Sequence, residues 1–166
     1  MNDTPVTVFR CLTTGVYVIG VAHGGRSNAF TAAWLTQVSF DPLLLALSVN
    51  PEHASYPLLR ESRTFAVSVL RRDQLDLARH FGTQSGSDID KLAEARWRVG
   101  QLGAPVLLDG AAYLECRVTG TMAAGDHNLI LRQVICGAIL AERAELLSYA
   151  DTGKLDGSAE LYPPSF

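Results

Sequence analysis

Two groups of polar residues in this sequence carry side chains that could do chemistry. The first is Ser48, Asn50 and Ser55, where an apolar run ends and a short helix is predicted to begin. Hydroxyl and amide groups beside a helix N-terminus can hold a phosphate, because the N–H groups there and the helix dipole attract anions. Plain capping of the helix by Ser55 explains the same residues and is the commoner outcome.

The second group is Gly125-Asp126-His127. It could be only a hairpin corner, in which Asp126 makes an Asx-type turn. Alternatively, the imidazole of His127 could line the mouth of a pocket. There it would donate a hydrogen bond to a carboxamide, or order a bound cofactor without moving protons itself.

Several familiar chemistries have no support in the sequence. There is no GxxxxGK[ST] phosphate loop, no GxGxxG at a strand-to-helix junction and no GxSxG elbow. The four histidines stand far apart, so no metal site is expected. Cys11, Cys116 and Cys136 are odd in number and form no CxxC pair, which predicts buried free thiols in a reducing cytoplasm.

The totals predict one soluble globular domain over residues 1–166. The chain is 48% hydrophobic and 19% charged, with a formal net charge of −3 and no long basic block, so nucleic acid is not an expected partner. The longest apolar run is far shorter than the ~20 residues of a membrane span, and the N-terminus does not resemble a signal peptide. We therefore expect a cytoplasmic protein without a membrane partner.

The stretch Ser27–Asn50 (SNAFTAAWLTQVSFDPLLLALSVN) organises the rest of the chain. Its apolar end, Leu43–Val49, follows a turn at Asp41-Pro42 and is typical of a buried strand. Its small residues would let a flat ligand approach the backbone closely and would keep donors near it. An ordinary loop is the simpler explanation of the same composition.

Other segments show strand patterns. In Ala112–Met122 the residues alternate, with Leu114 and Cys116 on one side and Tyr113 and Glu115 on the other, which predicts a half-exposed strand. The expected strands are Val16–Ala22, a part of Ala29–Trp34, Leu43–Val49, Thr64–Leu70, Ala112–Met122, His127–Glu142 with a possible bulge at Gly137, and Leu146–Tyr149.

Helical segments are few and short. We expect a brief helix in Pro5–Leu12 that plugs one end of the core, one or two turns after Ser55, a helix over Gln74–Phe81 and a turn near Lys91. Asp73 would cap the third helix and Gly82 would end it, before a polar surface segment from Thr83 to Asp90. No βαβ alternation recurs, so a mainly β fold is predicted, an antiparallel barrel with helices filling its gaps.

The order of these segments resembles the flavin reductase-like proteins, whose fold is an antiparallel Greek-key split barrel of the FMN-binding type. The group includes the reductase components of two-component monooxygenases and the flavoredoxins. The resemblance spans roughly Gly15 to Tyr149. It rests on GVYVIGVA from Gly15, Thr31-Ala32, Val38-Ser39-Phe40-Asp41-Pro42-Leu43, Ser48-Val49-Asn50, Phe65–Leu70 with Gln74, Leu77-Ala78 and Phe81, Gly103–Leu107, Leu114-Glu115-Cys116 and Gly125-Asp126-His127.

The resemblance implies a homodimer that binds FMN, or FAD, with NAD(P)H as co-substrate. His127 would be the catalytic residue, on the nicotinamide side of the pocket. The isoalloxazine ring would lie against Asn28 to Trp34, and the phosphate near Ser48, Asn50, Ser55 and Tyr56. The implied cofactor-binding residues are Asn28, Thr31, Ala32, Ala33, Trp34, Ser48, Val49, Asn50, Ser55, Tyr56 and Phe81.

The implied function is that of a flavin reductase, which passes a hydride from NAD(P)H to the flavin and supplies reduced flavin to a partner monooxygenase. One alternative is a flavoredoxin-like, FMN-binding electron-transfer protein that does not oxidise NAD(P)H, and another is a barrel that binds no FMN. The sequence departs from the family pattern at Leu43, where a second proline is frequent, and at Arg132-Gln133-Val134, where Gly-Glu-Val is frequent. Trp34 is closer to the flavoredoxin and nitrilotriacetate-type branch.

Overall fold

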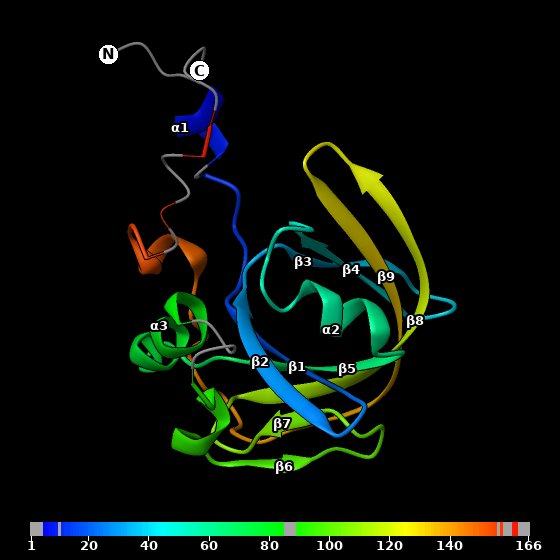
Figure 1. Cartoon of the computed structure of the whole chain (residues 1–166). Coiled ribbons are helices and arrows are strands. Elements are labelled where there is room, and N and C mark those ends of the chain that lie inside the picture. Colours follow the sequence, from blue (N-terminus) through cyan, green and yellow to red (C-terminus); the bar gives the residue numbers. More distant parts are fainter. Residues whose placement is uncertain (1–4, 10, 85–88, 156, 158–160, 163–166) are drawn as a thin grey trace.

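A computed structural model gives the arrangement of residues 5–9, 11–84, 89–155, 157 and 161–162 (Figure 1). Strands dominate the described residues, as predicted. They are β1 (Tyr17–His23), β2 (Arg26–Ala32), β3 (Leu35–Ser39), β4 (Leu44–Val49), β5 (Thr64–Val69), β6 (Trp97–Val99), β7 (Pro105–Leu107), β8 (Ala112–Ala124) and β9 (His127–Ile139).

Seven of these strands form one antiparallel sheet in the order β2-β1-β5-β8-β9-β4-β3. The two edge strands, β2 and β3, are consecutive in the chain and are joined only by Ala33 and Trp34. Since neighbouring Cα atoms are about 3.8 Å apart, this connection forces the opposite edges of the sheet together. The sheet therefore curls into a barrel with a seam at Ala33-Trp34, which confirms the predicted fold class.

The barrel interior holds the main hydrophobic core. Ile19, Leu47, Leu59, Phe65 and Val67 have no exposed surface and pack together there. Leu59 belongs to α2 (Tyr56–Glu61), which lies inside the curve of the sheet (Figure 1). β1, β4 and β5 are buried on both faces, which explains why their sequences are nearly continuous apolar runs.

A second layer covers the outer face of β1, β2 and β5. It consists of α3 (Leu75–Thr83), the 3₁₀ turn η1 (Lys91–Glu94) and the β6–β7 ribbon, with a further 3₁₀ turn, η2 (Tyr149–Thr152), nearby (Figure 1). β7 passes so close to β1 that a Cβ atom on Gly20 would stand 2.0 Å from the carbonyl oxygen of Pro105. Only glycine fits at this crossing.

This outer layer corrects the prediction for Ala112–Met122. Tyr113 and Glu115 were expected on an exposed face, yet both are buried. The carboxylate of Glu115 accepts hydrogen bonds from the backbone N–H groups of Gln101 and Leu102, at 3.0 and 2.7 Å. The segment that carries β6 and β7 therefore covers the face that alternation alone assigned to solvent.

The predicted helix boundaries need correction. α3 begins after Gln74, and Asp73 does not cap it, because its carboxylate binds Arg71 at 3.0 Å. Gly82 lies within α3 and does not end it. The predicted surface segment Thr83–Asp90 lies partly outside the described residues, at 85–88. The first helix, α1 (Pro5–Phe9), stands away from the barrel with Phe9 exposed, so it does not plug the core (Figure 1).

Several smaller predictions also change. β3 was not predicted, and Leu146–Tyr149 makes two isolated bridges, at Leu146 and Ser148, in place of a strand. The irregularity near Gly137 falls where Glu115-Cys116 pairs with Cys136 and Val134. Cys116 is buried as expected, but Cys11 is exposed, and all three thiols are free. In the described part of the chain, no helix has the length and apolar character of a membrane span.

Candidate flavin site

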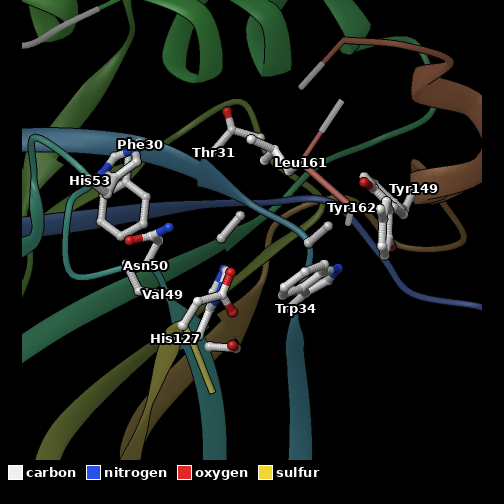
Figure 2. Close-up of a pocket in the computed structure, with 14 residues that line it drawn as sticks. Phe30, Thr31, Trp34, Val49, Asn50, His53, His127, Tyr149, Leu161 and Tyr162 are labelled. Carbon is white, nitrogen blue, oxygen red and sulfur yellow. The ribbon is translucent and has the colours of Figure 1, made fainter. Parts of the chain in front are cut away.

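A cavity of about 680 Å³ lies at the barrel seam (Figure 2). Its size falls within the range of sites that bind small molecules and cofactors. The seam explains its position, since the connection between the two sheet edges forms part of its wall. It is lined by Phe30, Thr31, Ala32, Ala33, Trp34, Ser48, Val49, Asn50, His53, Asp126, His127, Tyr149, Leu161 and Tyr162.

The chain from Thr31 to Trp34 forms an open backbone platform along this wall. Ala32 and Ala33 carry only methyl groups, which leaves the main chain accessible to a flat ligand. The hydroxyl of Thr31 donates to the carbonyl of Ala78 in α3 at 2.7 Å, and the carbonyl of Trp34 accepts from the N–H of Ser48 at 2.9 Å. These two bonds fix the platform to α3 on one side and to β4 on the other.

His127 faces this platform from the start of β9. Its ring centroid lies 4.9 Å from that of Trp34, with an angle of 42° between the ring planes. Its Nδ1 is 2.8 Å from a carboxylate oxygen of Asp126. The hydrogen bond to His127 is the main reason why the pKa of Asp126 is lowered below its usual value. Gly125, at φ +66°, makes the tight turn that brings both residues to the cavity.

The other side of the cavity carries two polar side chains, Asn50 and His53, beside the apolar Phe30 and Val49 (Figure 2). The ring of His53 packs on Phe30, with 4.9 Å between the ring centroids. Its Nδ1 accepts a hydrogen bond from the backbone N–H of Ser55 at 3.2 Å. Burial, together with the positive charge of Lys91, lowers the pKa of His53. The imidazole is therefore held neutral, with its proton on Nε2.

Lys91 is a buried cation behind this side of the cavity. It is 2% exposed, and its ammonium group donates to the carbonyl of Phe81 at 3.1 Å. Among the described residues no carboxylate pairs with it. Burial lowers the pKa of Lys91 from 10.5 to about 8, so the group is still largely charged at neutral pH.

The structure brings together most of the residues that the sequence singled out. Of these, Thr31, Ala32, Ala33, Trp34, Ser48, Val49, Asn50 and His127 line the cavity. Trp34 is 44% exposed, so it borders the cavity and does not fill the core. Residues far apart in the sequence thus meet at one place because the barrel closes there.

Four other predicted residues do not line the cavity: Asn28, Ser55, Tyr56 and Phe81. Ser55 is 2% exposed, and its hydroxyl accepts a hydrogen bond from the side chain of Asn28 at 3.1 Å. The hydroxyl of Tyr56 accepts from Asn128 at 2.6 Å. Phe81 is 1% exposed and belongs to the core between α3 and the sheet. These residues support the cavity wall from behind, and Ser55 does so through its N–H bond to His53.

Some lining residues were missed by sequence reasoning. His53 was weighed only as a metal ligand, although it follows Asn50 closely in a turn whose polar residues were noted. Tyr149, Leu161 and Tyr162 come from the C-terminal part of the chain, and no local pattern connects them to the barrel. In Figure 2 Tyr149 and Tyr162 lie on the Trp34 side of the cavity, across from Phe30 and His53.

The lining suits a flavin nucleotide. An alanine platform, apolar side chains such as Val49 and rings such as Trp34 would accept a flat aromatic system. The side chains of Asn50 and His53 supply hydrogen-bond donors at the opposite end. A ligand with a planar ring and an anionic group would therefore find a matching wall for each part.

Comparison with known proteins agrees with this geometry. The family model described as "Flavin reductase like domain" matches residues 9–157. Among solved structures, an NADH:FAD oxidoreductase from Streptomyces globisporus has a TM-score of 0.81 and 30% identity, covering 92% of this chain and 93% of that one. An FMN-binding protein from Thermus thermophilus has a TM-score of 0.80 and 27% identity, covering 93% and 90%.

Curated relatives include proteins that are longer than this chain. A high molecular weight rubredoxin from Moorella thermoacetica is 33% identical over 141 residues, which are 84% of this chain and 61% of that protein. The chain spans 22% of a putative diflavin flavoprotein from Synechocystis. Since the family model covers most of the chain, and these two solved structures share its fold over 93% and 90% of their length, the protein belongs to the flavin reductase-like family.

Proposed function

We propose that the protein is an NAD(P)H-dependent flavin reductase that uses FMN or FAD. The observation that carries this proposal is the position of His127 beside the Thr31–Trp34 platform, with its ring centroid 4.9 Å from that of Trp34, in the lining of a cavity of about 680 Å³. A related NADH:FAD oxidoreductase has been solved with NAD and FAD fragments, which supports the nicotinamide part of the proposal.

The residues would share the work as follows. The backbone of Thr31 to Ala33 would hold the flavin ring, and Asn50 would act near its polar tail. Trp34 and His127 would border the space in which a nicotinamide meets the ring. The flavin, when bound, supplies the hydride-accepting chemistry, while the protein contributes position, electrostatics and exclusion of water.

The proposal extends to the compartment, the oligomeric state and the partner of the protein. We place the protein in the cytoplasm, because all three of its thiols are free. We further propose that residues 1–166 act as one domain. We propose a homodimer, with exposed apolar residues of β8 and β9 available for the contact, such as Met122 near the hairpin turn and Ile139 at the end of β9. The reduced flavin would be passed to a partner monooxygenase. A structural neighbour from Mycobacterium thermoresistibile is named nitrilotriacetate monooxygenase component B, and it matches at 25% identity.

An oxidation assay tests the proposal. The purified protein is mixed with NADH or NADPH and with FMN, FAD or riboflavin, and the loss of near-ultraviolet absorbance of the reduced nucleotide is followed. Catalysed oxidation of at least one nucleotide with at least one flavin is expected. If no combination is turned over faster than free flavin alone, the reductase proposal fails.

A second candidate is an FMN-holding electron-transfer protein that never uses NAD(P)H. The names of the curated relatives favour it, since a high molecular weight rubredoxin and several diflavin flavoproteins match at 29–35% identity. A protein that retains FMN through gel filtration, shows its blue absorbance and is reduced by dithionite but by neither nucleotide would support this candidate over the first.

A further inference from the structure

One wall of the cavity lies outside the part of the chain that the family model matches. The match ends at residue 157, and Leu161 and Tyr162, which line the cavity, follow that residue. We call these two residues the C-terminal wall. Neither of them carries a charge. The wall is therefore a feature of this chain that membership of the family does not account for.

The chain that leads to this wall is fixed to the barrel beside the cavity. The backbone N–H of Tyr149 donates to the carbonyl of Thr14 at 2.8 Å, and the hydroxyl of Thr152 donates to the carbonyl of Tyr149 at 2.7 Å. Leu155 then packs, partly buried, against the core cluster that contains Phe81 of α3. Since Tyr149 itself lines the cavity, the C-terminal part of the chain leaves the barrel at the edge of the cavity.

The C-terminal wall stands at the apolar end of the cavity. In Figure 2 Tyr162 lies on the Trp34 side, across from the polar side chains of Asn50 and His53. Trp34, Leu161 and Tyr162 offer rings and methyl groups, with an indole N–H and a phenol hydroxyl as their polar atoms. Such a surface suits a flat, uncharged ring system better than it suits a phosphate.

Leu161 and Trp34 leave much of their apolar surface to solvent. Leu161 is 77% exposed and Trp34 is 44% exposed. Single exposed apolar side chains are ordinary on a protein surface, but these two border the same cavity, together with the methyl groups of Ala32 and Ala33. A ring system that enters the cavity would remove water from both side chains, which is favourable in proportion to the apolar area buried. The leucine is thus positioned for a contact that forms when a ligand is in place.

We propose that the C-terminal wall binds the ring system of the flavin, with Leu161 and Tyr162 covering its edge, and that this contact slows the release of the flavin. The inference rests on the proposed function, because it assumes that the cavity holds a flavin. The isoalloxazine ring is common to FMN, FAD and riboflavin, so the wall should strengthen the binding of all three alike. A contact with the phosphate would instead favour the nucleotides over riboflavin.

The test measures the dissociation constants and release rates of FMN and riboflavin, by flavin fluorescence, for the wild type and single variants. Leu161→Ala removes the apolar contact, whereas Leu161→Met keeps its size and apolar character. Leu146→Ala is the matched control, because Leu146 is a 55% exposed leucine outside the lining of the cavity. Urea unfolding of the flavin-free variants verifies that each of them keeps the wild-type fold.

We expect Leu161→Ala to weaken the binding of FMN and riboflavin alike, by about five- to tenfold and mainly through faster release. Tyr162→Ala should act in the same way, and Tyr162→Phe should not, because the ring carries the contact. Leu161→Met and Leu146→Ala should bind both flavins within about twofold of the wild type.

Three results would overturn the inference. The first is that neither Leu161→Ala nor Tyr162→Ala changes the constants of either flavin. The second is that Leu161→Ala weakens FMN binding and leaves riboflavin binding unchanged, which would place the wall at the phosphate. The third is a changed KM for NADH or NADPH with unchanged flavin constants, which would show that the wall serves the nicotinamide nucleotide.

Failure of the proposed function gives a different pattern. A wild type that binds neither flavin would refute the flavin site, and the C-terminal wall with it. A wild type that binds flavin but oxidises neither NADH nor NADPH would refute the reductase activity alone. In that case weaker flavin binding by Leu161→Ala than by Leu146→Ala would still support the wall, and equal binding would overturn it.

Discussion

Replacing Arg132 with methionine should stabilise the fold. Arg132 lies on β9, is 1% exposed and projects among the core residues of the barrel. Its Nη2 donates to the carbonyl of Leu59 at a long 3.4 Å, while Nε and Nη1 have no hydrogen-bond partner among the residues that the structure describes. The guanidinium also lies 4.7 Å from the ring centroid of Phe65. A buried cation with two unsatisfied donors is an unfavourable element of a core.

The size of the effect follows from the pKa of this group. Burial lowers the pKa of Arg132 from 12.5 to about 10. At about 1.4 kcal/mol per unit, keeping the charge inside the folded barrel costs on the order of 3 kcal/mol. Methionine has a similar length and no donors, but it gives up the contact of the charge with Phe65, worth about 1–2 kcal/mol. We expect a net gain of about 1–2 kcal/mol, or roughly 2–8 °C in Tm for a chain of this size.

Urea unfolding followed by tryptophan fluorescence measures this change in the flavin-free protein. Arg117→Met is the matched control, because Arg117 is exposed on the adjacent strand β8 and its loss should alter stability by no more than about 0.5 kcal/mol. If Arg132→Met unfolds at a lower urea concentration than the wild type while Arg117→Met is neutral, the guanidinium stabilises the barrel and the reasoning from unsatisfied donors is wrong.

Three further predictions concern the cavity and its supports. His127→Ala should slow NAD(P)H oxidation by roughly tenfold, the effect of losing one hydrogen bond to the bound nucleotide, and should change the FMN dissociation constant little; equal loss of both would place the residue elsewhere. Ser55→Ala should lower the free energy of unfolding by about 1 kcal/mol, because Asn28 loses its acceptor, and an unchanged free energy of unfolding would contradict its supporting role. Since the folded-state pKa of Lys91 is about 8 against 10.5 in the unfolded chain, the unfolded chain binds more protons between these values. Stability should therefore rise with pH across this window relative to Lys91→Met, and parallel pH profiles for the two proteins would refute the assignment.

The sequence predicted best where local patterns decide the structure. The apolar run at Leu43–Val49 contains β4, and the predicted strand Thr64–Leu70 contains β5. β-Branched residues before the turn at His23 became β1. In each case the residue pattern reflects burial on the sheet, so the predicted strand is present in the structure.

Prediction failed where a distant segment decides the environment. Alternation placed Tyr113 and Glu115 in solvent, because it records one core face and cannot foresee a second layer. The segment that buries them, around Gln101 and Leu102, is short and broken by glycine and proline. Asp73 has ideal chemistry for a helix cap, yet Arg71 takes its carboxylate two residues away. The preference of a single residue type for the helix cap does not show that a neighbouring arginine competes for the same carboxylate.

The cavity shows the same division between local and distant causes. The small residues at Ala32-Ala33 are a local signal for close approach of a ligand. The other residues of the cavity wall lie beside these alanines only because β2 and β3 are consecutive in sequence but stand at opposite edges of one sheet. The sheet must therefore close at Ala33-Trp34. Closure brings the β8–β9 turn with His127 to the same seam. A polar, small-residue segment between two strands is therefore weak evidence for a ligand site when taken alone. It becomes specific evidence when the strand order requires the barrel to close at that segment.

In the turn from Asn50 to Ser55, single hydrogen bonds decide which side chains reach the cavity. Both residues have polar side chains suited to a phosphate, and spacing does not rank them. Burial does, because Ser55 sits beneath the turn, with its hydroxyl bonded to Asn28 and its N–H bonded to His53. His53, which lies between them in the sequence, then keeps one nitrogen for the fold and one for the cavity. Hydrogen bonds that the sequence pattern does not show thus decide which polar side chain of the turn faces the cavity.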